Sequence, residues 1–101
     1  MPDHRFLALH LDIVGPLPEA GGSCYLLTII DRFTRWVEAI PLSTITAEAC
    51  ALALVMHWIS RFGVPESIVT DRGRQFTSGL WTELGNLLGI SRSQITSGSP
   101  M

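Results

Sequence analysis

The sequence predicts one α/β domain built on a five-stranded mixed sheet, in which three antiparallel strands are followed by an α-β-α-β segment. Three observations lead to this fold class. The chain opens with apolar, β-branched runs that are separated by Gly and Pro turns. A stretch with helical spacing follows, and a short apolar run after it is typical of a crossover to a parallel strand. The length of 101 residues suits a single domain covering residues 1–101.

The first half is expected to form an antiparallel meander. Its predicted strands are residues 6–14, 24–30 and 35–42. The first strand should close at residues 15–18, because the two prolines there cannot donate to a β-ladder. Asp31 precedes Arg-Phe-Thr, and we expect it to cap the turn between the second and third strands rather than to bind a ligand.

A helix is predicted over residues 46–62. Thr46 is a good N-cap and Glu48 suits the first turn, while Gly63 and Pro65 supply a strong stop signal. Its apolar face consists of Ala47, Ala51, Leu54, Val55, Trp58, Ile59 and Phe62. This stripe predicts core packing rather than a ligand site.

The rest of the chain should complete the sheet. The predicted elements are a strand at 67–70, a helix at 78–88 capped by Ser78, and a fifth strand at 90–96. The second helix presents the apolar residues Leu80, Trp81, Leu84, Leu87 and Leu88, which we expect to lie in the core.

Asp12 and Asp71 each lie where an apolar strand gives way to a loop. A carboxylate in such a run is costly to bury unless it is paired or coordinates a metal. Mg²⁺ prefers oxygen ligands and often uses one or two carboxylates together with water and phosphate. The two aspartates are therefore candidate ligands of one hard cation. The alternative is that each of them caps a turn.

Four segments occur in an order that resembles a known family. They are residues 11–18 (LDIVGPLP), 26–36 (LLTIIDRFTRW), 62–65 (FGVP) and 70–76 (TDRGRQF). Together they resemble the catalytic core of the integrases of retroviruses and gypsy-type LTR retrotransposons. The resemblance implies a ribonuclease H-like fold, DNA as partner, and Mg²⁺ or Mn²⁺ as cofactor. It also implies that Asp12 and Asp71 are the first two members of a catalytic Asp, Asp, Glu triad.

The third member of that triad would fall beyond Met101. We therefore expect an incomplete C-terminal part, a chain that is catalytically inactive by itself, and self-association through apolar surface that later helices would cover. Near the second aspartate, Arg72, Arg74 and Gln75 are candidates to contact the DNA backbone, although ordinary solvent exposure explains them equally well. Gly73 should allow a sharp turn.

The composition of the chain excludes some classes of protein but does not indicate a specific function. The formal net charge of −2 and the pI near 5.8 give no generic basic face, but an empty carboxylate site is acidic in any case. Cys24 and Cys50 have no metal-like spacing and suit an intracellular, reduced protein, for which a nuclear location is compatible. No apolar run approaches the length of a membrane span.

Two functions from different classes follow. The first is an integrase core-like domain, derived from a metal-dependent DNA strand transferase. The second is a non-catalytic module for nucleic-acid binding or self-association. A ribonuclease-type hydrolase is disfavoured, because residues 31–36 and 71–76 resemble integrases specifically.

Overall fold

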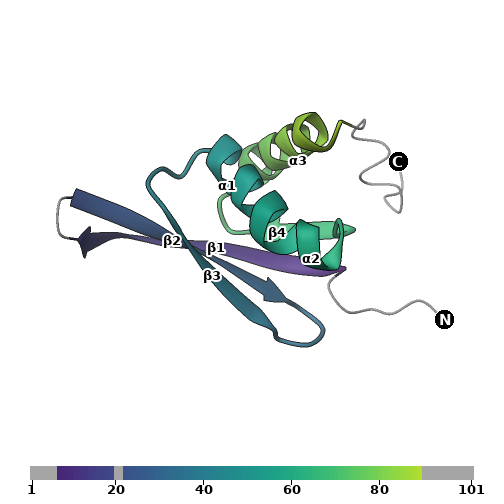
Figure 1. The fold of residues 1–101 in the computed structure, drawn as a ribbon, viewed down its shortest axis with the longest axis horizontal. Helices are drawn as coiled ribbons and strands as arrows, with labels where there is room; N and C mark the ends of the chain where they lie inside the picture. The colour runs from purple at the N-terminus through teal and green to yellow at the C-terminus, as the bar shows by residue number, and fades with distance from the viewer. Residues whose placement is uncertain (1–6, 20–21, 90–101) are drawn as a thin grey trace.

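The computed structural model describes residues 7–19 and 22–89, which form a mixed sheet with helices packed against it (Figure 1). The strands are β1 (Ala8–Glu19), β2 (Gly22–Asp31), β3 (Val37–Leu42) and β4 (Ser67–Thr70). The helices are α1 (Ala47–Leu54), the π-helical segment η1 (Val55–Ile59), α2 (Ser60–Phe62) and α3 (Arg74–Leu88). The predicted α/β class is confirmed, with four strands among the described residues. The predicted fifth strand, 90–96, lies outside them.

The sheet has the order β3-β2-β1-β4. Strands β1, β2 and β3 form the predicted antiparallel meander, and β4 pairs in parallel with β1. The parallel orientation follows from the intervening helices, which carry the chain from one end of the sheet back to the other. Strands β1 and β2 also extend beyond β3 as a two-stranded arm (Figure 1).

The prediction that the first strand ends before Gly15 was wrong. Strand β1 continues to Glu19, and its pairing with β2 shifts register between Val14 and Leu17. Gly15 has a φ of 132° and is followed by a cis peptide bond to Pro16. Because the irregularity leaves Pro16 out of the ladder, the strand resumes beyond it without needing the missing N–H.

The turn between β2 and β3 is built around Asp31. Its side chain is fully buried, and its Oδ2 accepts hydrogen bonds from the backbone N–H of Thr34 at 2.8 Å and from the Thr34 hydroxyl. The turn-capping role predicted for Asp31 is therefore confirmed. The third strand begins at Val37 instead of residue 35, because Arg35 has a φ of 69° and cannot continue a β-ladder.

The first predicted helix is confirmed as a continuous run through α1, η1 and α2. The Thr46 Oγ1 accepts a hydrogen bond from the backbone N–H of Ala49 at 3.1 Å, and Gly63 ends the run with a φ of 90°. The π-helical turn at Val55–Ile59 was not predicted, since hydrophobic spacing does not distinguish it from α-helix.

The second helix begins at Arg74 rather than at Ser78. Gly73 has a φ of 96°, and its carbonyl accepts hydrogen bonds from both the backbone N–H and the hydroxyl of Thr77, each at 3.1 Å. These bonds close the first helical turn five residues earlier than a Ser78 cap would. The helix ends at Gly89 in a left-handed conformation, as Gly allows.

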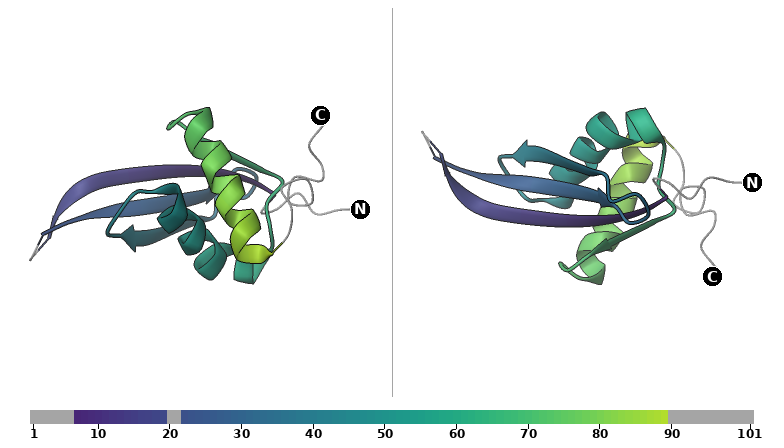
Figure 2. Two further views of the ribbon diagram at one scale, coloured as in Figure 1. Left: turned by 90° about the horizontal axis from the view of Figure 1, so that it is seen from above. Right: turned by 90° about the horizontal axis from the view of Figure 1, so that it is seen from below.

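All described helices pack on one face of the sheet (Figure 2). The core between them consists of Leu9, Leu11, Leu27, Ile29, Ile40, Cys50, Ala51, Ala53, Leu54, Trp58, Ile68, Leu80, Trp81 and Leu84. Most of the predicted helix stripes are therefore confirmed as core. Leu87 is an exception, with 46% of its surface exposed. None of the described helices is long and apolar enough to cross a membrane.

The opposite face of the sheet carries no described helix (Figure 2). The register places Val69, His10, Ile30 and Val37 side by side in a row that crosses all four strands. Because side chains alternate along a strand, this row lies opposite the buried residues Leu9, Leu11 and Ile29. The valines at the ends of the row are exposed.

Candidate metal and nucleic-acid site

The parallel pairing of β1 and β4 brings the two predicted aspartates to neighbouring positions. Leu11 pairs with Thr70, and these are the last paired residues of the two strands. Asp12 and Asp71 are the next residue on each chain segment. Adjacent strands lie about 4.8 Å apart, so the fold sets the two backbone positions beside each other at one end of the parallel pair.

Asp12 is held at a continuous part of the sheet. It pairs with Thr28 of β2, whose hydroxyl donates to the Asp12 carbonyl oxygen at 3.1 Å. One carboxylate oxygen, Oδ1, accepts from the backbone N–H of Ile13 at 3.0 Å. Since its neighbour Leu11 faces the core, the half-buried Asp12 side chain projects from the other face of the sheet. The strand therefore fixes the direction of this carboxylate.

Asp71 stands at the start of the short turn that joins β4 to α3. It is exposed, and the following N–H, that of Arg72, donates to the Thr70 hydroxyl oxygen at 3.3 Å. The left-handed Gly73 then redirects the chain into α3. The sharp turn predicted at Gly73 is thus confirmed, and Phe76 packs against the core.

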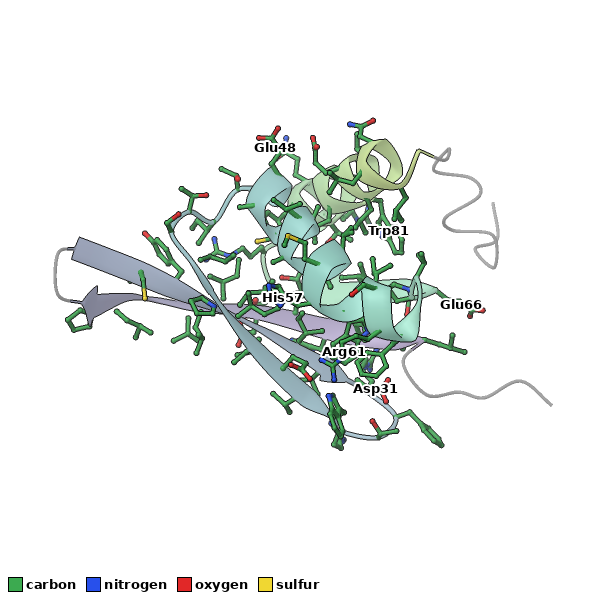
Figure 3. The ribbon with its side chains drawn as sticks, viewed as in Figure 1. Asp31, Glu48, His57, Arg61, Glu66 and Trp81 are labelled. Atoms are coloured by element: carbon green, nitrogen blue, oxygen red, sulfur yellow. The ribbon has the colours of Figure 1, made fainter. Side chains whose placement is uncertain are left out.

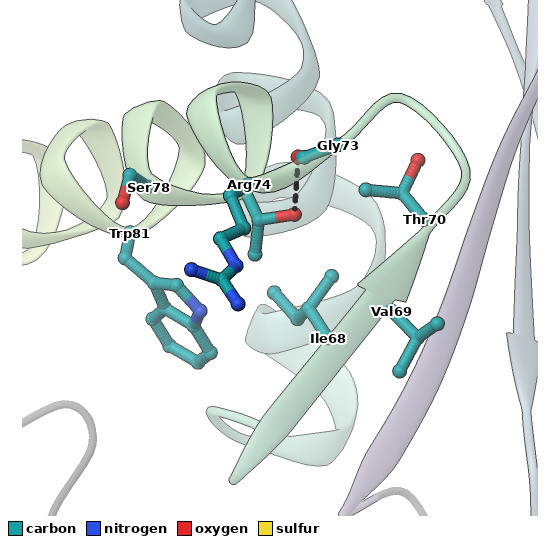
Figure 4. Close-up of a pocket in the computed structure, with 8 residues that line it drawn as sticks. Ile68, Val69, Thr70, Gly73, Arg74, Ser78 and Trp81 are labelled. Carbon is teal, nitrogen blue, oxygen red and sulfur yellow. Dashed lines mark hydrogen bonds between the residues drawn. The ribbon is translucent and has the colours of Figure 1, made fainter.

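Arg72, Arg74 and Gln75 are all exposed, but they do not lie on one loop. Arg72 belongs to the turn, whereas Arg74 and Gln75 form the first residues of α3. Figure 4 shows the Arg74 side chain directed toward Trp81, within a groove along β4. The groove has a volume of about 510 Å³ and is lined by Ile68, Val69, Thr70, Gly73, Arg74, Thr77, Ser78 and Trp81.

The donor atoms near Asp12 and Asp71 are oxygens, which suits a hard cation such as Mg²⁺. Among residues 7–19 and 22–89, no group of three or more His, Cys, Asp or Glu side chains could hold a metal ion. Burial raises the pKa of the Cys50 thiol to about 11, with the charge of Arg72 opposing this shift, so the thiol is protonated at neutral pH. Two carboxylates leave most coordination positions to water or phosphate.

A second polar cluster was not predicted from the sequence. Glu38 Oε2 accepts hydrogen bonds from Trp36 Nε1 at 2.9 Å and from Arg61 Nη1 at 3.0 Å. Figure 3 shows Arg61 at the same end of the molecule as Asp31, far from Glu48. Arg61 and Glu38 are 23 positions apart, and no local signal in the sequence relates them.

Comparison with known proteins identifies the family to which this chain is similar. The family model described as integrase core domain matches residues 3–100. The chain is 31% identical over 90 residues to a retrovirus-related Pol polyprotein from transposon 412 of Drosophila melanogaster, covering 88% of this chain and 7% of that protein. It is 36% identical over 81 residues to the Gag-Pol polyprotein of baboon endogenous virus strain M7, covering 80% of this chain and 5% of that protein.

A third relative is the Pol polyprotein of radiation murine leukemia virus strain Kaplan. It is 36% identical over 80 residues, which cover 79% of this chain and 14% of that protein. The chain therefore spans only a small part of the length of the curated relatives that it matches.

Proposed function

This chain belongs to the integrase core domain family, and we propose that Asp12 and Asp71 provide two ligands of a divalent-metal site for phosphoryl transfer on DNA. The observation that carries the proposal is the Leu11–Thr70 pair, after which each strand continues with an aspartate. Mg²⁺ or Mn²⁺ bound there would neutralise phosphate charge and favour deprotonation of an attacking water or hydroxyl. A protein that acts on DNA in this way would work inside the cell, for example in the nucleus.

The chain's own residues would position the substrate. Arg72 follows Asp71 in the turn and Arg74 begins α3, and a guanidinium can hold a phosphate with two parallel hydrogen bonds. Gln75 offers an amide on the first turn of α3. Asp12 would keep a fixed orientation through the bond from the Ile13 N–H, which leaves its second carboxylate oxygen for the cation.

The 101 residues alone should bind metal weakly and should not join DNA strands. Phosphoryl transfer requires attacking and leaving oxygens to be held in line, and two ligands constrain a cation loosely. The described residues offer no third His, Cys, Asp or Glu ligand next to the two aspartates. The second candidate function is a module that binds nucleic acid without catalysis.

The metal site is tested by calorimetric titration with Mn²⁺. We expect a dissociation constant on the order of millimolar, lost in both Asp12→Asn and Asp71→Asn. Glu48→Gln is the matched control, because Glu48 is an exposed carboxylate at the start of α1, away from the two aspartates. Equal Mn²⁺ binding by the native chain and both aspartate variants would refute the site. Joining of labelled DNA ends by the native chain in Mn²⁺ would refute its inactivity.

The groove along β4 supports a further part of the fold proposal. The outer edge of β4 has no described strand beside it. Where a helix joins two parallel strands of one sheet, the connection is right-handed in nearly all proteins. We propose that the fifth strand of the ribonuclease H-like sheet, expected at residues 90–96 outside the described part of the chain, pairs with the edge of β4 that borders this groove.

A further inference from the structure

The turn between β2 and β3 displays aromatic and basic side chains together. We call Arg32, Phe33, Arg35 and Trp36 the hairpin surface. Phe33 is 64% exposed and Trp36 is 48% exposed, and both arginines are exposed as well. Large aromatic side chains are seldom left so open by folding alone, because their burial is favourable. Their exposure makes the hairpin surface a candidate contact surface.

The Trp36 indole is fixed in place although it is half exposed. Its Nε1 donates to Glu38 Oε2 at 2.9 Å, and its ring meets the ring of Phe62 edge-on, with centroids 6.4 Å apart. Phe62 in turn contacts the fully buried Trp58, with centroids 4.8 Å apart. The indole is thus connected to the core through one intermediate ring. An aromatic surface that is already ordered loses little conformational entropy on binding.

The backbone of the hairpin surface is also ordered. The Asp31 N–H donates to the Trp36 carbonyl at 2.9 Å, and the Arg35 N–H donates to the Asp31 carbonyl at 2.8 Å. The Arg32 N–H donates to the Ala8 carbonyl at 2.9 Å, which ties the turn to the start of β1. These bonds hold Arg32 and Arg35 on the same short turn as the indole.

The local charge of this turn is positive, in contrast to the net charge of −2 of the whole chain. Glu38 is paired with Arg61 at 3.0 Å, and the carboxylate of Asp31 is buried within the turn. No ion pair involves Arg32 or Arg35 among the described residues. The guanidiniums of Arg32 and Arg35 can contact phosphates, and the indole of Trp36 can stack on a flat ring. The surface therefore suits a ligand that carries both groups.

We propose that the hairpin surface binds single-stranded nucleic acid, with a base stacked on Trp36 and with phosphates contacted by Arg32 and Arg35. Aromatic stacking and a positive backbone contact are the two parts of sequence-tolerant single-strand recognition. The surface is separate from Asp12 and Asp71, and binding there needs no divalent metal. It therefore stands or falls independently of the proposed metal site.

Tryptophan fluorescence reports on this contact directly. The chain has three tryptophans, and Trp58 and Trp81 are buried. We expect oligo(dT), added in EDTA at low salt, to quench the emission of the native chain, and Trp36→Phe to remove that quenching. Anisotropy of a labelled oligo(dT) measures affinity without relying on the indole. Trp36→Ala should weaken binding by at least about fivefold, whereas Trp36→Phe should retain most of it.

The arginines are tested by salt dependence. Arg32→Gln and Arg35→Asn should each weaken binding and lower the slope of log affinity against log salt by about 0.7. Asn is chosen at position 35 because it tolerates the positive φ of that residue. Glu38→Gln tests the positioning of the indole and should reduce the fluorescence quenching more than it reduces the salt slope.

Two control variants show whether binding is local to the hairpin surface. Met56→Ala removes an exposed apolar side chain on the helical side and should leave oligo(dT) binding unchanged. Glu48→Gln, which changes an exposed carboxylate at the start of α1, should also leave binding in EDTA unchanged. The proposal is overturned if Trp36→Ala and both arginine variants, each with native circular dichroism, bind oligo(dT) like the native chain. It is likewise overturned if poly-glutamate competes as well as oligo(dT), which would indicate an acidic protein partner.

Discussion

Leu11 of β1 pairs with Thr70 of β4, and an aspartate follows each of them. This pairing makes the proposed metal site depend on strand register. A shift of either strand by one residue would turn its aspartate toward the core and its leucine or threonine toward the opposite face. The buried side chains of Leu9, Leu11 and Ile68 oppose such a shift, because all three would lose their contacts with the helices. The packing of these side chains against the helices thus determines where Asp12 and Asp71 lie, at the end of the parallel β1–β4 pairing.

Two leucines of α3 should differ sharply in their contribution to stability. Leu80 is fully buried, whereas Leu87 is nearly half exposed. Leu80→Ala should lower the free energy of unfolding by about 2–5 kcal/mol, since it removes buried methyl groups and leaves a cavity. Leu87→Ala, the matched control on the same helix, should change it by less than about 1 kcal/mol. Urea denaturation followed by circular dichroism measures both, and equal losses would contradict the orientation of α3.

Gly15 should tolerate substitution less well than Gly63. Both have positive φ, but a Cβ added at Gly15 would lie 2.9 Å from the Cys24 carbonyl oxygen, whereas a Cβ added at Gly63 would have no neighbouring atom within 4 Å. Gly63→Ala should cost about 1–2 kcal/mol from backbone strain alone. Gly15→Ala adds a steric overlap with backbone and should cost more. Thermal melting of the two variants in parallel tests this order.

The sequence was sufficient to predict elements whose signals are local. Thr46 and Gly63 bound a helix because capping and stop signals act within a few residues, and Asp31 was correctly interpreted as a turn cap. The parallel pairing of β4 also followed from the helical crossover that the sequence predicts after the third strand. In each case, the determining interactions lie close in sequence or obey a general rule of topology.

The sequence-based predictions fail where tertiary contacts determine the structure. Gly15 and Pro16 have the composition of a strand terminator, yet pairing with β2 resumes at Leu17 beyond the irregularity. Ser78 looked like a helix cap, but the backbone of Gly73 already begins α3. The contact of Trp36 and Arg61 with Glu38 joins β3 to α2, and only the folded chain brings them together.

Acid should weaken the attachment of α2 to β3. Hydrogen bonding to Trp36, together with the bond and charge of Arg61, holds the pKa of Glu38 below its ordinary value of 4.5, against a smaller desolvation effect. A lowered pKa in the folded state means that this stabilisation is present above about pH 4.5 and is lost as the pH falls through the folded-state value. Melting temperatures of the native chain should therefore fall more steeply below that pH than those of Glu38→Gln. Parallel curves for the two proteins would rule out this contribution.

The proposed fifth strand predicts a specific pattern of hydrogen exchange. If residues 90–96 pair with β4, the β4 amides that point away from β1 are protected, and Gln94→Pro should reduce that protection because proline disrupts strand pairing. Ser97→Pro, outside the predicted strand, serves as the control. Amide exchange measured by nuclear magnetic resonance distinguishes the variants. Fast exchange of those amides in the native chain would exclude the strand.

The open face of the sheet should make the chain self-associate. In the row Val69, His10, Ile30 and Val37, the terminal valines are 40% and 54% exposed, and no described helix covers them. Burying this row against a second copy would remove apolar surface from water on both chains.

Sedimentation velocity over a range of protein concentrations tests this self-association. Val37→Asp and Val69→Asp should each shift the native chain toward monomer, because a pair of like charges would have to be buried in a symmetric contact. Met56→Asp places the same charge on an exposed apolar residue of the helical side and should leave association unchanged. If all three variants sedimented alike, the row would not be the contact. If the native chain were monomeric throughout, the open face would be stable in water by itself, and the expectation of self-association would be wrong.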